Sequence, residues 1–421
     1  MTAVTALQKP VDPFVSVAAP DRPSQPANII ASDAEAIEVA HRIAANLVDG
    51  AADRDRGRRI SLAELDTFSQ SGLWGITVPK SYGGADVSFV TVAAVFKIIA
   101  AADSSVSQIP QNHFEIVDLI RLTGSPEQQR LLFGEVLQGT RLGNAFSEFK
   151  GKNVEAFETR IIRHPNTKDD SYIINGEKFY STGALFAHLV PIVAIGEDGH
   201  VHVAIADRSA PGLSVIDDWS AFGQRGTASG TVRLENVIVP ASHVLPAHLA
   251  YEQISAIGPV SQLIHAAIDA GIAVAAIEKT IDFVRHHARP WVDSQQARAG
   301  DDPYTIAQIG DLKIKQHAAE ALLERGGRAV DRAIALPSLA EIGRAKIAVA
   351  EAKVLTTELV ILATNKLFEL SGTRSTLAQH NLDRYWRDAR THTLHDPVRW
   401  KYNAVGRYYL NGIEPPIHSW I

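Results

Sequence analysis

The segment from Arg387 to Pro397, RDARTHTLHDP, concentrates side chains that can move protons. It sets His392 and His395 close to the carboxylate of Asp396. Histidine can give or take a proton near neutral pH. The segment is therefore either a proton-transfer site beside arginines that could hold an anionic cofactor, or a plain helix C-terminus. Cations suit such an end and proline stops the helix, and the segment taken alone favours this second interpretation.

The composition narrows the class of protein. The chain has 421 residues, 46% of them hydrophobic, and a net charge of −6, which indicates two or three domains of a globular protein. It has no cysteine, which excludes disulfides, thiolate metal sites and a cysteine nucleophile. We predict no metal site, no nucleic-acid or membrane partner, and a cytoplasmic location.

Helical and extended blocks must position these side chains. Residues 1–30 are rich in proline and predict an extended arm. Residues 31–140 show helical spacing and no strand signal, so we expect an all-helical domain. Ser61 and Glu64 form a capping-box signature at the start of one of its helices.

The pattern then changes twice. Residues 141–248 hold β-like runs separated by Gly, Asp and Pro, which predict a small antiparallel barrel or sandwich. Within it, Ser171–Lys178 predicts a hairpin that turns at Asn175-Gly176. Residues 249–421 predict long helices of an up-and-down four-helix bundle followed by a tail. The expected fold class is α+β, mostly α.

This order of blocks resembles the acyl-CoA dehydrogenase superfamily of flavoproteins, over nearly the whole chain after the arm. The strings that carry this resemblance are GLWGITVPKSYGGADVS (Gly72–Ser88), NGEKFYSTG (Asn175–Gly183), FELSG (Phe368–Gly372) and RYWRDAR (Arg384–Arg390). Further strings resemble its flavin-dependent monooxygenase branch, which includes dibenzothiophene monooxygenases, and within it the SfnB-type sulfur-acquisition oxidoreductases. These are IPQNHF (Ile109–Phe114), GNAFSE (Gly143–Glu148), DDWSAFGQRGTASGT (Asp217–Thr231), ARPW (Ala288–Trp291), DDPYTI (Asp301–Ile306) and RTHTLHDPVRWKY (Arg390–Tyr402).

The resemblance implies a two-component monooxygenase in sulfur acquisition. A separate flavin reductase would supply reduced FMN, with FAD as the alternative cofactor, and O2 would form a C4a-(hydro)peroxyflavin that oxygenates a small organosulfur compound. The alternative function is an FAD-dependent acyl-CoA dehydrogenase or nitroalkane-oxidase-like oxidase with Asp396 as base. The sequence has no GxGxxG after a strand, so a bound nicotinamide is not supported. The resemblance also implies a homo-oligomer, a dimer of dimers.

The same resemblance assigns the catalytic residues. His395 is the expected proton donor near the flavin, with Asp396 in support, and His113 is expected to line the same pocket. Thr182 supplies a hydroxyl for the flavin, and Asn144 belongs to the oxygen-activating pocket. Each histidine could instead be a structural core residue, and Asn144 could equally be a turn residue.

The cofactor residues fall into two expected sets. Trp219, together with Thr182, would contact the flavin ring, although a tryptophan there could equally be a buried anchor. The phosphate would be bound by arginine forks and by backbone and hydroxyl donors of a turn. This phosphate set is Lys178 or Arg387, Arg289, Ser371, Gly372, Thr373 and Arg374.

Overall fold

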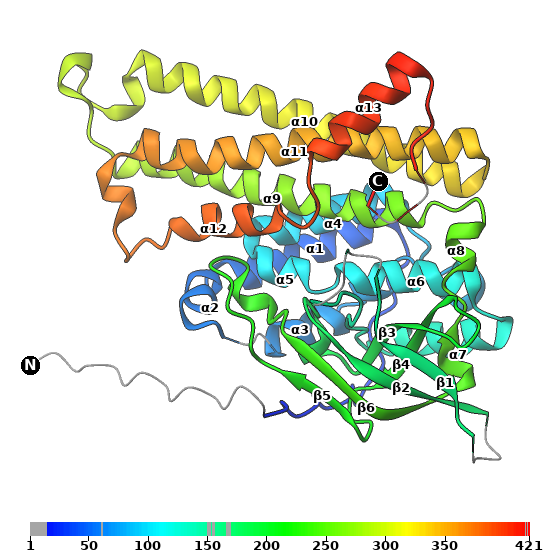
Figure 1. Cartoon of the computed structure of the whole chain (residues 1–421). Coiled ribbons are helices and arrows are strands. Elements are labelled where there is room, and N and C mark those ends of the chain that lie inside the picture. The colour runs from blue at the N-terminus through cyan, green and yellow to red at the C-terminus, as the bar shows by residue number, and fades with distance from the viewer. Residues whose placement is uncertain are drawn as a thin grey trace, which may run out of the picture.

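The computed structural model of the chain describes residues 15–59, 62–149, 153, 156–165, 170–416, 418 and 420–421. Helices come first, a β-sheet follows, and long helices complete the chain (Figure 1). The predicted fold class is therefore confirmed. Ser61 of the predicted capping box lies outside the described residues.

The first helical block owes its helices to clear start signals and apolar faces. Ser32 caps the first helix by accepting from the Glu35 amide, and Ser125 with Gln128 forms a complete capping box ahead of Pro126. The helices are α1 (Asp33–Val48), α2 (Ala51–Gly57), α3 (Leu62–Gln70), η1 (Leu73–Gly75), η2 (Lys80–Tyr82), α4 (Phe89–Ala102), α5 (Ser104–Gln108), α6 (Gln111–Thr123) and α7 (Pro126–Leu137).

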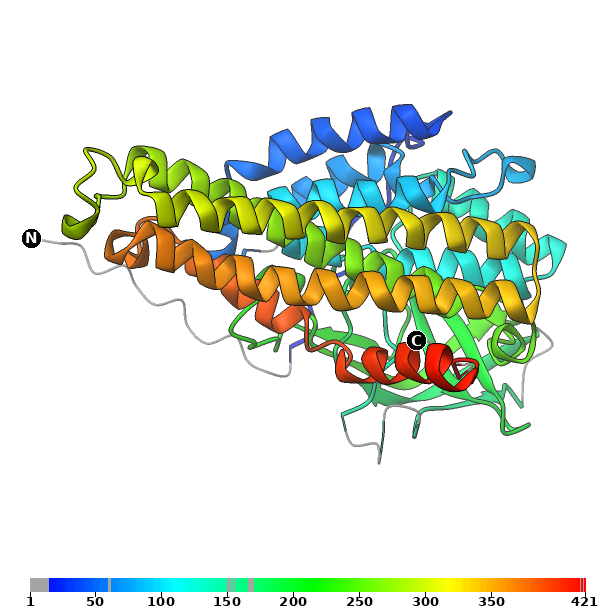
Figure 2. The same cartoon turned by 90° about the horizontal axis from the view of Figure 1, so that it is seen from above.

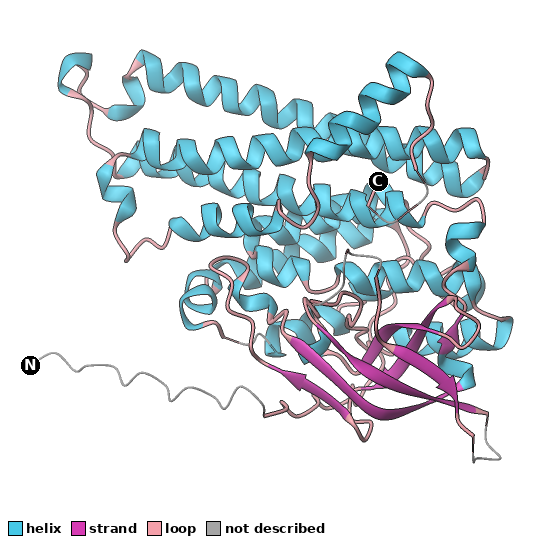
Figure 3. Cartoon of the chain, viewed as in Figure 1, coloured by secondary structure: helices cyan, strands magenta, loops and turns pink. Residues whose placement is uncertain are grey.

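One seven-stranded sheet forms the middle of the chain (Figure 3). The strands are β1 (Arg160–Arg163), β2 (Ser171–Lys178), β3 (Leu189–Ile195), β4 (Val201–Asp207), β5 (Leu213–Ile216), β6 (Thr231–Pro240) and β7 (Val244–Leu245). Their order is β5-β6-β2-β1-β3-β4-β7. Most neighbours are antiparallel as predicted, but β1 pairs with β3 in parallel, so the sheet is mixed.

The hairpin predicted within Ser171–Lys178 is wrong. These residues form one strand, β2, which pairs with β1 on one side and β6 on the other. The register shifts between Ile174 and Gly176, where a β-bulge replaces the turn. Gly176 has φ of +156°, and a Cβ there would lie 2.3 Å from Thr159 Oγ1. Tertiary pairing thus overrode the local turn preference of Asn-Gly.

The described end of the predicted arm lies along the sheet edge. Val17 N donates to the Val215 carbonyl, and Ser16 bridges Ile216. Arg22 forms ion pairs with Glu135 at 2.7 Å and with Asp207 at 2.6 Å. These contacts join the arm to both α7 and β4.

Three long helices lie side by side in the last block (Figure 2). They are α9 (Ile257–His286), α10 (Pro303–Ala335) and α11 (Leu339–Ser371), with the shorter α8 (Leu249–Glu252), α12 (Asp383–His392) and α13 (Arg399–Asn411) around them. Among the described helices, α9 alone is long and apolar enough to cross a membrane. However, 89% of its apolar stretch is buried inside the protein, as in the core helix of a bundle.

Candidate active site

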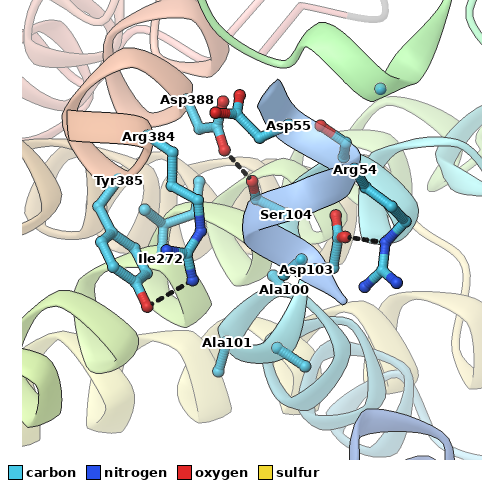
Figure 4. A pocket seen from close by; sticks show the side chains of 14 residues that line it. Arg54, Asp55, Ala100, Ala101, Asp103, Ser104, Ile272, Arg384, Tyr385 and Asp388 are labelled. Carbon is cyan, nitrogen blue, oxygen red and sulfur yellow. Dashed lines mark hydrogen bonds and ion pairs between the residues drawn. The ribbon is translucent and has the colours of Figure 1, made fainter. Parts of the chain in front are cut away.

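Helix α12 is fixed in place by polar contacts from both neighbouring blocks. Asp388 accepts from Ser104 Oγ at 2.8 Å (Figure 4). It also accepts from the Gln224 amide at 2.6 Å. Burial raises the pKa of Asp388 to about 6. The β-domain turn also approaches α6, since a Cβ on Gly183 would lie 3.0 Å from the Ile109 carbonyl. The string Asp217–Thr231 therefore contacts α12 directly, and the strings Asn175–Gly183 and Ile109–Phe114 contact each other.

Arg387 strengthens this anchor. Its guanidinium forms a two-pronged ion pair with Asp55, at 2.9 and 2.6 Å, and its Nε donates to Asp383 at 2.7 Å. Three charge-assisted bonds occupy the fork. This arrangement argues against the predicted contact between Arg387 and a phosphate.

His395 and Asp396 lie in the turn that follows α12, in different environments. The His395 side chain is 40% exposed, whereas that of Asp396 is 3% exposed and lies 2.9 Å from Lys401 Nζ. Nδ1 of His395 is 3.7 Å from Asp396 Oδ1. Burial alone would raise the pKa of Asp396, but the adjoining His395 ring and the ammonium groups of Lys353 and Lys401 outweigh it and hold that pKa well below its usual range.

This pairing bears on which residue does the chemistry. A carboxylate with a strongly lowered pKa and a buried ammonium partner is a weak base. Asp396 is therefore poorly suited to abstract a substrate proton, as the dehydrogenase alternative requires. His395 keeps a solvent-accessible ring and is the better candidate for proton transfer.

A cavity of about 500 Å³ opens beside His395. Its walls come from α13 and the C-terminal tail, and they include Trp400, Ile413 and Trp420. Lys401 ties this wall to the turn, because its ammonium contacts both Asp396 and the Trp420 carbonyl.

Behind His395 lies a buried polar cluster that the sequence analysis did not find. The ring of His265 of α9 contacts that of His395 with ring centroids 3.9 Å apart, and its Nδ1 is 3.3 Å from His392 Nε2. His392 Nδ1 in turn lies 2.5 Å from Asp269, which also pairs with Lys353 at 2.8 Å. A signal was available: polar residues four apart in an otherwise apolar, buried helix need partners.

His113 is completely buried and both ring nitrogens are engaged. Nε2 lies 2.8 Å from the Trp74 carbonyl, and Nδ1 accepts from the Leu142 amide at 3.1 Å. Burial lowers its pKa to about 4, so it is neutral near pH 7. This geometry favours the structural interpretation of His113, as a residue that joins α6 to the chain entering the sheet.

The remaining ring-contacting candidates lie on β-domain loops. Thr182 Oγ1 is 2.6 Å from Ser229 Oγ, and Trp219 Nε1 donates to the Gln224 carbonyl at 3.0 Å. Asn144 is buried, and its side-chain oxygen accepts from the Phe146 amide at 3.0 Å, as a turn residue does. Trp219 is thus placed on the loop that reaches α12 through Gln224.

Several buried polar atoms at this junction lack a hydrogen-bond partner among the described residues. They are Ser181 Oγ, Thr391 Oγ1 and both side-chain atoms of the Gln224 amide. Buried polar groups are normally paired, so a cluster of unpaired ones indicates a missing polar ligand. A flavin ring, which has several hydrogen-bond donors and acceptors, fits this junction. Ser181, the residue before Thr182, also belongs to this junction.

Most of the predicted phosphate residues gather at the far end of the bundle. Arg374 donates to the His287 carbonyl at 3.2 Å, which brings it near Arg289 in the chain, and both arginines are exposed. Ser371 Oγ is buried without a hydrogen-bond partner among the described residues. Gly372 has φ of +71°, so the turn after α11 presents its backbone in a shape that favours glycine.

The two groups of candidates are far apart within one chain. His265, which touches His395, and His287, which touches Arg374, are about 22 residues apart along α9 and its end. At 1.5 Å per residue this is roughly 33 Å. One FMN cannot span that distance. The predicted phosphate-binding residues of one chain therefore cannot bind the phosphate of a flavin whose ring lies beside His395 of the same chain.

Comparison with known proteins identifies the family. Models of acyl-CoA dehydrogenase N-terminal, middle and C-terminal domains match residues 33–140, 146–237 and 263–400. The chain is 33% identical to dibenzothiophene monooxygenase of Rhodococcus qingshengii, over 91% of this chain and 95% of that one. The chain belongs to the acyl-CoA dehydrogenase family.

Two further similarities point to the monooxygenases of this family. The probable FMNH2-dependent monooxygenase SfnC of Pseudomonas putida is 29% identical, over 90% of this chain and 96% of its own. The crystal structure of FMN-bound TdsC from Paenibacillus sp. A11-2 superposes with a TM-score of 0.87 and 31% identity, covering 92% of this chain and 100% of TdsC. The predicted branch of the acyl-CoA dehydrogenase family is confirmed.

The predicted phosphate contact of Lys178 conflicts with its surroundings in the structure. Lys178 is fully buried, and its ammonium donates to Glu148 at 2.7 Å and to the Phe146 carbonyl at 3.0 Å. Burial lowers the pKa of Lys178 to about 8, although the Glu148 carboxylate opposes the shift. A phosphate contact would require breaking this buried ion pair, which argues against the predicted contact between Lys178 and a phosphate.

The described residues also contain one group of potential metal ligands. His200, His248 and Glu252 place their ligand atoms within 4.8 Å of one another near β4 and α8, with His200 and Glu252 exposed. Neither the predicted chemistry nor the polar junction at α12 involves them.

Proposed function

We propose that this protein is a reduced-FMN-dependent monooxygenase that oxygenates a small organosulfur compound in sulfur acquisition, with a separate reductase supplying the flavin. The observation that carries this proposal is the contrast between the two neighbours in the turn. Asp396 is buried and paired with Lys401, while His395 is accessible beside a cavity. The similar proteins, which include FMNH2-dependent and FMN-bound ones, support the same function.

The residues at the α12 junction would hold the flavin ring. Thr182 and Ser181 offer hydroxyl groups, Gln224 offers an amide, and Trp219 offers an aromatic face. When bound, reduced FMN supplies the electrons that activate O2, so that one oxygen atom reaches the sulfur and the other becomes water. The chain contributes orientation, exclusion of water and a proton.

His395 would handle that proton. Its Nδ1 faces Asp396, so Nε2 is the nitrogen left to donate toward the cavity. Asp396 then orients the ring, as a carboxylate beside a catalytic imidazole does. Lys401 in turn keeps Asp396 ionised.

The substrate would enter the cavity beside His395. Much of the wall consists of apolar and aromatic side chains such as Pro397, Trp400, Ile413 and Trp420. Such a wall suits a compound with little charge, and a volume of about 500 Å³ limits its size. A neutral sulfide, sulfoxide or sulfone meets both conditions.

A complete site would need a second copy of the chain. Arg289, Arg374 and the turn at Ser371–Thr373 lie roughly 33 Å from His395 of their own chain, so they would bind the phosphate of a flavin whose ring is held by another subunit. A dimer of dimers provides such paired contacts. The cytoplasm is the compartment that this function implies, because a nicotinamide-dependent reductase must supply reduced flavin.

The test is a coupled assay with flavin reductase, NADH, FMN, O2 and a panel of small sulfides, sulfoxides and sulfones. We expect an oxygenated product from at least one compound. His395→Gln should lower product formation by about 10²- to 10⁴-fold, while flavin oxidation continues and releases hydrogen peroxide. His317→Gln, at an exposed position of α10, is the control and should leave product formation unchanged.

Two results would contradict this function. The first is oxygen consumption to peroxide alone across the whole panel. The second is anaerobic bleaching of bound flavin by an acyl-CoA, which would establish the dehydrogenase alternative instead.

A further inference from the structure

Three histidines form a row that runs from the cavity into the protein interior. His395 is partly exposed, while His265 and His392 are 0% and 4% exposed. The rings of His265 and His395 are tilted by 36° at a centroid distance of 3.9 Å, and those of His265 and His392 are 5.3 Å apart. The row therefore joins the proposed proton donor to a site that water does not reach.

A buried ion pair closes the inner end of the row. Asp269 is 0% exposed, and one of its oxygens lies 2.5 Å from His392 Nδ1. The other oxygen accepts from Lys353 Nζ at 2.8 Å and from Thr357 Oγ1 at 3.0 Å. Although burial alone would raise the pKa of Asp269, the charge of Lys353 and the hydrogen bonds from His392 and Lys353 lower it, so this carboxyl is ionised.

These contacts fix the orientation of each ring. Because the Asp269 carboxylate can only accept, His392 carries a hydrogen on Nδ1 and turns Nε2 toward His265. His392 Nε2 also lies 3.0 Å from Gln108 Oε1; because Nε2 can only accept in this tautomer, the Gln108 amide bonds to it when its NH2 group is turned toward the ring. His265 is held through its Nδ1, and its Nε2 finds no hydrogen-bond partner in the described part of the chain.

We propose that Asp269, His392 and His265 are positioning residues that orient the His395 ring and set how tightly it holds its proton. The chain of contacts Asp269–His392–His265–His395 supports this assignment, and so does the burial of the inner three side chains, which are 0% to 4% exposed. The proposal rests on the role of His395 in the proposed function. It adds three residues, none of which lines the cavity.

The charged groups around the row determine in which direction each substitution should move the titration midpoint. Besides Asp269, the acidic groups near the row are Glu115 on α6 and Asp396, and the basic groups are Lys353 on α11 and Lys401 on α13. Burial, followed by the neighbouring positive charges, lowers the pKa of His265, and burial also lowers that of His392 although Asp269 opposes it. Both rings are thus neutral near pH 7. The negative charge of Asp269 and the positive charge of Lys353 then nearly cancel, and removing either charge leaves a net charge beside the row.

The experiment removes each charge at nearly constant volume. Asp269→Asn should move the titration midpoint of His395 to lower pH, because a nearby negative charge is lost. Lys353→Met should move it to higher pH, and each shift should be about 0.5 to 1 pH unit. The midpoint is measured on the protein without flavin, from the pH dependence of imidazole C2 hydrogen–deuterium exchange, resolved residue by residue by mass spectrometry.

Thr357→Val is the matched control, because it removes a donor to Asp269 without changing charge. It should leave the midpoint within about 0.2 pH unit of the original. If Lys353→Met does not fold, the comparison of Asp269→Asn with Thr357→Val still tests the downward shift. Unchanged midpoints in the folded charge variants, or shifts of the same sign, overturn the proposal.

The outcome is separable from that of the proposed function. Opposite shifts without any oxygenated product would leave the positioning role intact and refute the monooxygenase activity. Product formation with an unchanged His395 midpoint would support the monooxygenase activity and refute the positioning role. Where both hold, the pH profile of kcat should move in the same direction as the midpoint in each variant.

Discussion

Lys401→Met removes one half of a buried ion pair at the proposed site. The side chains of Lys401 and Asp396 are 1% and 3% exposed, and their charged atoms are 2.9 Å apart. Methionine fills a similar volume but cannot neutralise the carboxylate. After the substitution, the His395 ring is left beside the carboxylate, with its Nδ1 3.7 Å from Asp396 Oδ1 and its side chain 40% exposed.

The expected loss in the free energy of unfolding follows from the burial of the ion pair rather than from the distance between its charged atoms. Breaking a buried ion pair by deleting one partner costs roughly 3–5 kcal/mol, because the other charge stays buried without compensation. The unfolding equilibrium constant should therefore shift toward the unfolded state by about two to nearly four orders of magnitude. The Trp420 carbonyl also loses its donor, which loosens the cavity wall.

The assay is urea-induced unfolding followed by far-ultraviolet circular dichroism at one fixed protein concentration. The matched control is Lys279→Met, because Lys279 and Asp282 are also 2.9 Å apart but 42% and 44% exposed. An exposed pair contributes about 1 kcal/mol or less. The double variant Lys401→Met with Asp396→Leu should regain most of the lost stability, since no lone charge remains.

Two results would refute this reasoning. One is a loss in Lys401→Met no larger than that in Lys279→Met, which would mean that Asp396 is not buried as a charge. The other is a double variant as unstable as Lys401→Met, which would mean that packing by the lysine stem, rather than the ion pair, holds the turn.

Three further predictions concern acid stability, a core histidine and flavin affinity. The pKa of Asp396 is lowered in the folded state, so the stability that its charge contributes is complete above the unfolded pKa of about 3.9 and is lost as the pH falls below it. The difference in unfolding free energy between the original protein and Asp396→Asn should therefore shrink below about pH 4 in acid titrations. His113→Phe should lower the free energy of unfolding by about 2–4 kcal/mol in urea, because it strands the Trp74 carbonyl and the Leu142 amide, whereas His317→Phe at an exposed site should not. Arg374→Met should weaken FMN binding by about 10- to 100-fold and leave the affinity for riboflavin, which lacks the phosphate, unchanged. Lys178→Met, measured on its folded fraction, should change neither affinity. Fluorescence titration measures both affinities, and equal losses for the two ligands would remove Arg374 from the phosphate site.

The order of the three blocks could be predicted from the sequence because it depends on short-range properties. Hydrophobic periodicity, capping residues and proline positions act within one or two turns of chain. Ser125 with Gln128 shows this, since the capping box and Pro126 set the start of α7 without help from distant residues. The pattern of strings that resembled flavin-dependent monooxygenases likewise needed no structure to recognise.

Pairings between distant residues could not be predicted in this way. Asn175-Gly176 favours a tight turn locally, yet β1 and β6 both pair with this stretch and hold it in a strand with a β-bulge. Lys178 had the charge for a phosphate, but Glu148 lies within reach only in the folded sheet. In each position a long-range contact, which no local window contains, decided the outcome.

The sequence by itself determined the kinds of side chain available for chemistry and their order: His392, His395 and Asp396 at the end of a helix, in a chain without cysteine. Only the tertiary structure decided what each does. It paired Asp396 with Lys401, left His395 open to the cavity, and placed His265 behind it from a helix more than a hundred residues earlier. The physical reason is that proton affinity depends on burial and neighbouring charge, and both are set by packing.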